Sequence, residues 1–186
     1  MTYLLISIIL FMLLLGILML KRSKKIAIAL FILPILFILV SGSWLIFEKN
    51  YHFVKNTNLS KEVIDDIALY ASLEEYQSNN KNIQFSKGEN VYYPTLVKTP
   101  SLRIGANKKG EILYVSTKLP KQATSKNIKV TDSKDEVIKK YGGSYYTGIE
   151  MGIGKFIAYV DRDSKRHIRF WLEDEQVKEI EFKELK

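Results

Sequence analysis

The chain offers few side chains that could do acid–base or metal chemistry, since it contains two histidines and no cysteine. His52 lies in a polar segment, and His167 stands beside basic residues, where we expect a solvated imidazole rather than a general base. Asp161 and Asp163 are spaced like two calcium ligands, but the further acidic ligands and the closing glutamate of a calcium loop are missing. The sequence therefore predicts no catalytic residue, no metal site and no enzyme activity.

Three glycines could suggest a phosphate cradle. Gly148, Gly152 and Gly154 lie close together in TGIEMGIGK, but no Lys-Ser or Lys-Thr pair follows and no helix start is evident. A phosphate-binding loop needs the helix N-terminus behind its glycines. We therefore predict a loop between a helix and a strand at this point, and no bound cofactor.

Aromatic side chains are the remaining candidates for a functional surface. They are frequent in the second half of the chain, and aromatic-rich sheet faces are often protein-binding surfaces. Alternation along a strand places Trp171 on the face opposite Phe170 and Leu172, so at least half of the aromatic set is expected in a core. We predict a protein-binding face anchored by Trp171, Tyr145 and Tyr146.

Two short helices are expected to position the strands, and both begin with the same signal. Ser72 is followed by Glu75, and Ser133 is followed by Glu136, 61 positions later in the chain (133 against 72). In each pair the serine hydroxyl accepts a hydrogen bond from the glutamate backbone, and the glutamate side chain reaches back to the serine amide. The first signal has an alternative, which is one continuous helix over residues 60–77.

Two apolar runs at the start of the chain have the length of membrane spans. Residues 2–20 and 26–47 each number about 20, and at roughly 1.5 Å per residue each reaches across a hydrocarbon core of roughly 30 Å. The basic loop at residues 21–25 favours a cytoplasmic position for the turn between them. We predict a transmembrane helical hairpin over residues 1–48 in the plasma membrane of a bacterium, with both termini and the rest of the chain outside.

The net charge of +8 indicates which partners the surface favours. Acidic and basic residues are interleaved, as in a solvated surface, and a mildly basic domain is weakly attracted to anionic polymers such as those of a cell wall. Nucleic acid is not an expected partner, because there is no dense stripe of Lys and Arg. The absence of cysteine excludes thiolate metal sites and disulfide bonds, and it is compatible with an extracytoplasmic location.

The chain after the apolar runs divides into a stalk and two modules of the same plan. Residues 49–59 show no sustained period and are the predicted stalk, and residues 119–127 are a polar linker. A first α+β module is expected over residues 60–118 and a second over residues 128–186. In each, a short helix precedes an antiparallel meander. The predicted strands are 91–97, 102–104 and 112–115, with a tight turn at 107–110, and then 156–160, 168–172 and 177–182.

The second module carries a resemblance to a known family. Residues 128–142, IKVTDSKDEVIKKYG, followed by a strand with aromatic residues at 168–172, resemble the beta-lactamase-inhibitor-protein-like module, whose relatives include the small lipoprotein of the outer-membrane assembly machine. The match is good over residues 128–186 and faint over residues 60–118, and Thr131 and Tyr70 stand where the family usually has Gly. The resemblance implies helices packed on an antiparallel sheet, often in tandem, that bind other proteins and do no chemistry.

The expected fold class is thus α+β, with a transmembrane hairpin followed by a tandem module of short helices on antiparallel sheet. The expected function is a membrane-anchored, extracytoplasmic protein-binding module without catalytic activity, of the immunity, inhibitor or envelope-assembly type. Its partner would be another envelope or secreted protein, and the hairpin would contact membrane lipids. The alternative is a sensory or regulatory subunit whose transmembrane hairpin pairs with a polytopic membrane enzyme or transporter.

Overall fold

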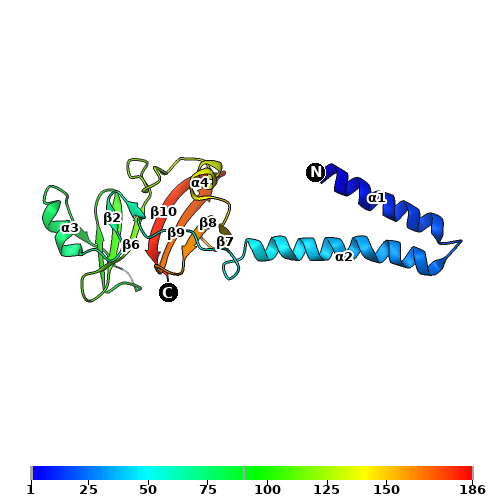
Figure 1. Ribbon diagram of the computed structural model, residues 1–186. Coiled ribbons are helices and arrows are strands. Elements are labelled where there is room, and N and C mark those ends of the chain that lie inside the picture. Colours follow the sequence, from blue (N-terminus) through cyan, green and yellow to red (C-terminus); the bar gives the residue numbers. More distant parts are fainter. Residues whose placement is uncertain (1, 90, 186) are drawn as a thin grey trace. The chain divides into compact units, whose positions relative to one another are not determined.

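The computed structural model describes residues 2–89 and 91–185, without the side chains of residues 2–8, 41 and 44–48. Two compact units make up the chain, Met1–Glu48 and Lys49–Lys186 (Figure 1). The first unit consists of helices, and the second is an α+β fold built on a large antiparallel sheet. Each unit is described by itself below.

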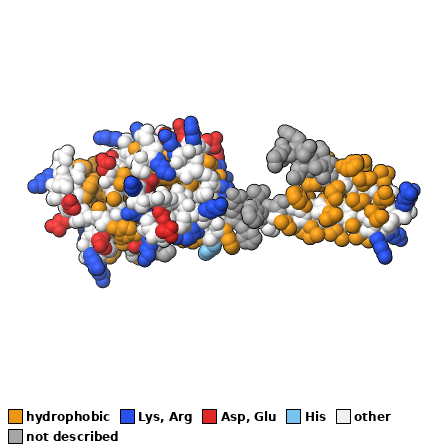
Figure 2. All heavy atoms as spheres, viewed as in Figure 1, with side chains coloured by type: hydrophobic (Ala, Val, Ile, Leu, Met, Phe, Trp, Pro, Cys, Tyr) orange, Lys and Arg blue, Asp and Glu red, His pale blue; other side chains and the backbone are white. Residues whose placement is uncertain are grey.

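The first unit is a pair of helices, α1 (Thr2–Met19) and α2 (Lys24–Glu48), that pack on each other through a small residue. A Cβ atom on Gly16 would lie 3.1 Å from the ring of Phe31, so glycine allows this close approach. Hydrophobic side chains cover much of the visible surface of both helices, and Lys and Arg gather at the turn between them (Figure 2). Exposed large apolar side chains here include Leu10, Phe11, Leu14, Leu18, Leu33, Ile38, Leu39 and Val40.

The predicted transmembrane hairpin is wrong, because no helix across the residues that the structure describes is both long and apolar enough to cross a membrane. The predicted multi-pass location in a plasma membrane, with both termini outside, is corrected by the same finding. α1 has 18 residues, which at roughly 1.5 Å per residue makes it about 27 Å long, against roughly 30 Å of hydrocarbon. α2 begins with two lysines and contains Pro34.

The second unit is organised around one eight-stranded antiparallel sheet with the strand order β3-β4-β5-β6-β10-β9-β8-β7. Two further short strands, β1 (Val63–Ile64) and β2 (Ile67–Ala68), pair with each other, and two helices, α3 (Leu73–Asn79) and α4 (Lys134–Tyr141), precede the two sets of strands. The sheet strands are β3 (Ser86–Lys87), β4 (Thr95–Lys98), β5 (Leu102–Ala106), β6 (Ile112–Thr117), β7 (Tyr146–Glu150), β8 (Gly154–Asp161), β9 (Arg166–Glu173) and β10 (Gln176–Glu184).

The strand order shows how the two halves of this unit meet. Strands β3 to β6 come from the predicted first module and β7 to β10 from the second, and the last strand of each lies at the centre of the sheet. β6 and β10 pair there in antiparallel fashion, with Ile180 opposite Thr117 and Phe182 opposite Val115. The two halves therefore share one continuous hydrogen-bonded sheet.

Each half anchors its helix to its last strand with the same three backbone hydrogen bonds. In both halves the residue two before the helix N-cap donates to that strand, the strand donates back to the residue one before the cap, and the first helical residue donates to the preceding turn. In the first half these bonds are Tyr70 N to Ile112 O (2.7 Å), Ile112 N to Ala71 O (2.9 Å) and Leu73 N to Gly110 O (2.9 Å). In the second they are Thr131 N to Val177 O (2.7 Å), Val177 N to Asp132 O (2.9 Å) and Lys134 N to Glu175 O (2.9 Å).

The backbone before each helix also takes the same unusual conformation. Tyr70 has φ of 70° and Thr131 has φ of 85°, both in the left-handed region that favours glycine. These are the two positions at which the resembled family usually has Gly. A β-branched residue such as Thr131 is strained there, so the surrounding hydrogen bonds must hold the backbone in place.

Both helices begin at their predicted capping serines. Ser133 Oγ accepts from the Glu136 backbone (3.2 Å), and the Glu136 carboxylate accepts from the Ser133 backbone (3.1 Å), which completes a capping box. Ser72 Oγ accepts from the Glu75 backbone (3.2 Å). The alternative of one helix over residues 60–77 does not form, because strands β1 and β2 and the turn between them occupy residues 63–68.

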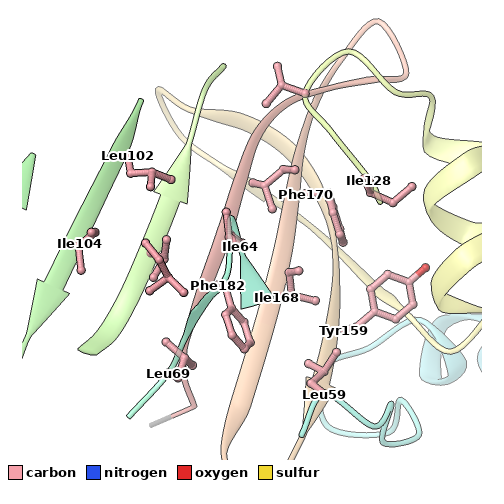
Figure 3. Close-up of a cluster of buried hydrophobic side chains, with 14 of the residues drawn as sticks. Leu59, Ile64, Leu69, Leu102, Ile104, Ile128, Tyr159, Ile168, Phe170 and Phe182 are labelled. Atoms are coloured by element: carbon pink, nitrogen blue, oxygen red, sulfur yellow. The ribbon is translucent and has the colours of Figure 1, made fainter. Parts of the chain in front are cut away.

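The main core lies between one face of the sheet and the segments that precede the two helices (Figure 3). Alternate residues of the strands supply one side of it, among them Ile104 of β5, Phe170 of β9 and Phe182 of β10. Ile64 and Ile128, from equivalent segments before α3 and α4, supply the other side. Because this face is filled, any binding surface of the sheet must be its second face.

Candidate binding face

The second face of the sheet, here called the open face, carries the side chains that alternate with the core residues. It is hollowed into a groove of about 690 Å³. The groove combines aromatic rings with charged groups, and residues from both halves of the unit line it. They include Tyr93, Arg103 and Tyr114 from the first half and Tyr146, Glu150, His167, Arg169, Trp171, Glu181 and Lys183 from the second.

Two of the three predicted binding residues lie together on the open face. Trp171 and Tyr146 form a cluster with Phe156, whose ring meets each of theirs edge to face. Trp171 is 1% exposed and Tyr146 is 8% exposed, so both form the floor of the face rather than an exposed surface. Within the described chain the indole Nε1 of Trp171 is buried and has no hydrogen-bond partner. An unpaired buried donor is costly, which makes this atom a candidate contact for a ligand.

The third predicted residue, Tyr145, lies on the other side of the sheet. Its ring packs at the margin of the main core beside Tyr159. The ammonium group of Lys49 sits 3.7 Å above the ring centre, which is a cation–π contact. Tyr145 and Tyr146 are neighbours in the chain and therefore point to opposite faces.

An ion network crosses the centre of the open face. Arg169 Nη1 lies 3.0 Å from the Glu150 carboxylate and 3.8 Å from that of Glu181, and Lys183 Nζ lies 3.5 Å from Glu181. The Arg169 guanidinium also lies over the ring of Phe156, 4.1 Å from its centre. Burial lowers the pKa of Lys183, although the Glu181 carboxylate opposes that shift. These acidic groups are thus neutralised by cations of the same face.

His167 is part of this face and is buried, contrary to the expectation of a solvated imidazole. Its exposed fraction is 4%, and its Nε2 lies 2.8 Å from the hydroxyl of Tyr146. Burial, with the nearby charges of Lys183 and Arg169, lowers the pKa of His167 to about 3. The imidazole is therefore neutral near pH 7, and its role is structural hydrogen bonding.

The basic side chains at the β4–β5 end of the open face were not anticipated from the sequence. Lys98 and Arg103 are directly opposite each other on neighbouring strands. They line, together with Lys118, a hollow of about 300 Å³. The one sequence signal that could have revealed this pair is the short hairpin around Pro100, which sets the register of the two strands.

Two loops at the margins of the groove expose large apolar side chains. The segment before β4 exposes Val91 (99%) and Tyr92 (77%), and the β7–β8 hairpin exposes Met151 (97%) and Ile153 (42%). Tyr92 from the first segment and Ile153 from the second line the groove itself. The margins of the groove are therefore apolar, while its floor is aromatic and charged.

The glycine-rich segment forms this β7–β8 hairpin, instead of the predicted loop between a helix and a strand. Gly148 lies beneath the ring of Phe156, where a Cβ atom would come within 2.3 Å of the ring. Gly152 has φ of 80° and forms part of the turn. The glycines thus serve packing and chain reversal, and their pattern is explained without a phosphate.

Of the two aspartates considered as calcium ligands, Asp161 ends β8 and Asp163 lies in the β8–β9 turn. The Asp161 carboxylate accepts hydrogen bonds from the backbone of Leu59 (2.8 Å) and Ser164 (3.1 Å). Burial alone would raise the pKa of Asp161, but these hydrogen bonds hold it below its usual value. Across the described residues, no group of three or more His, Asp or Glu side chains is close enough to hold a metal ion. The predictions of no cofactor and no enzyme activity stay predictions.

Comparisons of this chain with protein-family models, with curated proteins and with solved structures give no match.

Proposed function

We propose that the chain is a protein-binding module and that the open face of the sheet is its binding surface. The single observation that carries this proposal is the groove with exposed apolar side chains at its margins. Large exposed apolar side chains that gather around a groove mark interaction sites more often than they mark ordinary surface. The resemblance to the beta-lactamase-inhibitor-protein-like module supports a protein-binding role, because it implies helices packed on an antiparallel sheet that bind other proteins.

The form of the groove favours an extended segment of a partner protein. The face presents a buried, unpaired donor at Trp171 and aromatic rings of both halves. Peptide carbonyl groups accept from such donors, and apolar side chains pack on such rings. The exposed side chains of Tyr92 and Ile153, which line the groove, would be covered when the segment binds.

The test is a selection of random displayed peptides on the full chain, kept in solution with a non-ionic detergent because α1 and α2 expose apolar side chains. We expect the selection to yield peptides that bind the wild-type chain. The double variant Tyr92→Ser/Ile153→Ser should weaken them by about tenfold or more, since both side chains are exposed and line the groove. Its matched control is Lys108→Ser/Lys109→Ser, at the exposed tip of the β5–β6 hairpin, which should leave binding unchanged.

Two results would overturn the proposal. One is a selection that yields no binder to a chain whose unfolding transition shows that it is folded. The other is a set of binders that the Tyr92→Ser/Ile153→Ser variant binds as tightly as the wild type does.

A further inference from the structure

We infer that the partner segment carries a carboxylate side chain, and that this carboxylate binds between Lys98 and Arg103. The inference rests on the proposed function and specifies the chemistry of the partner. Lys98 on β4 and Arg103 on β5 are directly opposite each other and both exposed, so two positive charges stand side by side on the same face. Like charges in that position are destabilising unless an anion lies between them.

No Asp or Glu of the described chain forms an ion pair with Lys98 or Arg103. The hollow of about 300 Å³ that they share with Lys118 has no Asp or Glu in its lining. Lys118 itself pairs with Glu179 at 3.2 Å. Two cations of the hollow are therefore left without a counter-charge.

The acidic groups farther along the open face are already engaged. Glu150 and Glu181 pair with Arg169, and Glu181 also pairs with Lys183. Among the described side chains that line these hollows, the cations left without an acidic partner are therefore those at the β4–β5 end. A single carboxylate placed there would complete the pairing, and a guanidinium such as that of Arg103 can bind it through two parallel hydrogen bonds.

The position of Arg103 links this hollow to the apolar part of the groove. Arg103 lines the basic hollow, the large groove and a third hollow that contains Trp171. One extended segment can therefore place an acidic side chain at Arg103 and apolar side chains against the aromatic floor. A polyanion such as nucleic acid fits less well, because Lys118, Arg169 and Lys183 on the rest of the face are already paired with glutamates.

The experiment uses the peptides selected on the full chain. In the tightest binder each Asp or Glu is replaced in turn by Asn or Gln. We expect one replacement to weaken binding to the wild-type chain by about tenfold, and Arg103→Gln to weaken the original peptide by a similar factor. Combining the two changes should cost little more than either alone, which identifies them as a pair. Arg103→Glu should bind the peptide with Lys at that position better than the wild-type chain does.

The controls separate this inference from the proposed function. Lys108→Gln, an exposed lysine at the tip of the β5–β6 hairpin, should leave binding unchanged. Arg103→Gln should not lower the unfolding midpoint, since the Arg103 side chain makes no ion pair among the described residues and the substitution removes a like charge opposite Lys98. Peptides whose binding depends on Tyr92 and Ile153 but tolerates every amide replacement would overturn the carboxylate while leaving the proposed binding face intact. The carboxylate would also be overturned if oligo(dT) bound in a way that depends on Arg103 while no peptide needed an Asp or Glu for binding.

Discussion

His167 is the side chain whose environment departs furthest from what its neighbours in sequence indicate. Arg166, Arg169 and Lys165 surround it in the chain, yet alternation along β9 turns its ring inward, against Tyr146. The ring planes are stacked at 16° with their centres 5.8 Å apart. Burial favours the neutral imidazole over the charged one. Protonation of His167 therefore opposes folding.

That opposition predicts a dependence of stability on pH. The folded-state pKa of His167 is lowered to about 3 from an ordinary value of 6.5. Between these values the unfolded chain binds a proton that the folded chain does not, so stability falls as pH falls below about 6.5. The loss attributable to His167 is at most roughly 1.4 kcal/mol per pH unit. His167→Gln removes this titration, so its free energy of unfolding in urea should fall less steeply between pH 6.5 and 4.

The matched control for this prediction is His52→Gln, because the His52 side chain is exposed in the structure. Its stability curve should run parallel to that of the wild type over the same pH range. If the His167→Gln curve were also parallel, His167 would bind its proton over the same pH range in the folded and the unfolded chain, and the lowered pKa of the buried imidazole would be contradicted.

At the scale of the elements, the equivalent positions of α3 and α4 give a direct comparison. Each helix begins at a serine whose hydroxyl accepts from the backbone three residues on. Ser133 and Glu136 form both hydrogen bonds of a capping box at the start of α4. At the start of α3, Ser72 accepts one hydrogen bond, from the Glu75 backbone. The two helices therefore share a role and differ in how many bonds secure their first turn.

We predict that Ser72→Ala and Ser133→Ala each lower the free energy of unfolding by about 1 kcal/mol. Ser133→Ala should cost at least as much as Ser72→Ala, because the Glu136 carboxylate loses the hydroxyl it also contacts. Urea unfolding of the full chain measures both. The control is Ser78→Ala, since Ser78 lies in the last turn of α3 and does not cap its start. A silent Ser133→Ala would contradict the role of the box.

The elements that the sequence predicts well are those with a local signal. The capping residues of α4, the turn at residues 107–110 and the last three strands depend on neighbouring residues, and the structure has an element at each of them. The strand predicted at 91–97 is shorter and begins at Thr95, directly after a proline that cannot donate to a ladder. The pairing of β6 with β10 has no local signal, because the contact joins segments far apart in the chain.

The candidate site was harder to predict for the same reason. Trp171 was placed correctly on the face opposite Phe170, but whether that face is covered depends on what packs over it. The segment predicted as a stalk supplies part of that cover, through Tyr51 and Val54. The periodicity of a strand predicts which residues share a face. It does not predict which distant segment of the chain packs on that face.

At the scale of the whole molecule, residues 49–60 connect the helical unit to the sheet and are held along the β8–β9 hairpin. The Arg162 guanidinium donates to the carbonyl oxygen of Val54 (2.9 Å), to that of Tyr51 and to the side chain of Asn56 (2.8 Å). Arg166 donates to the carbonyls of Leu59 and Ser60. A segment without regular secondary structure thus has its carbonyl groups satisfied by arginine side chains.

This arrangement predicts that Arg162 keeps the connecting segment closed against the sheet. Arg162→Met retains most of the apolar stem and removes all three hydrogen bonds, so local opening of residues 51–56 should become more frequent. Lys55 is exposed and provides a trypsin site within that segment. Cleavage after Lys55 in the full chain should accelerate by about tenfold or more in the variant, as the open population rises with the loss of the bonds. Arg103→Met is the matched control, because Arg103 holds no part of the segment, and its cleavage rate should equal that of the wild type. An unchanged rate in Arg162→Met would mean that the packing of Tyr51 and Val54 on the aromatic cluster is sufficient to hold the segment.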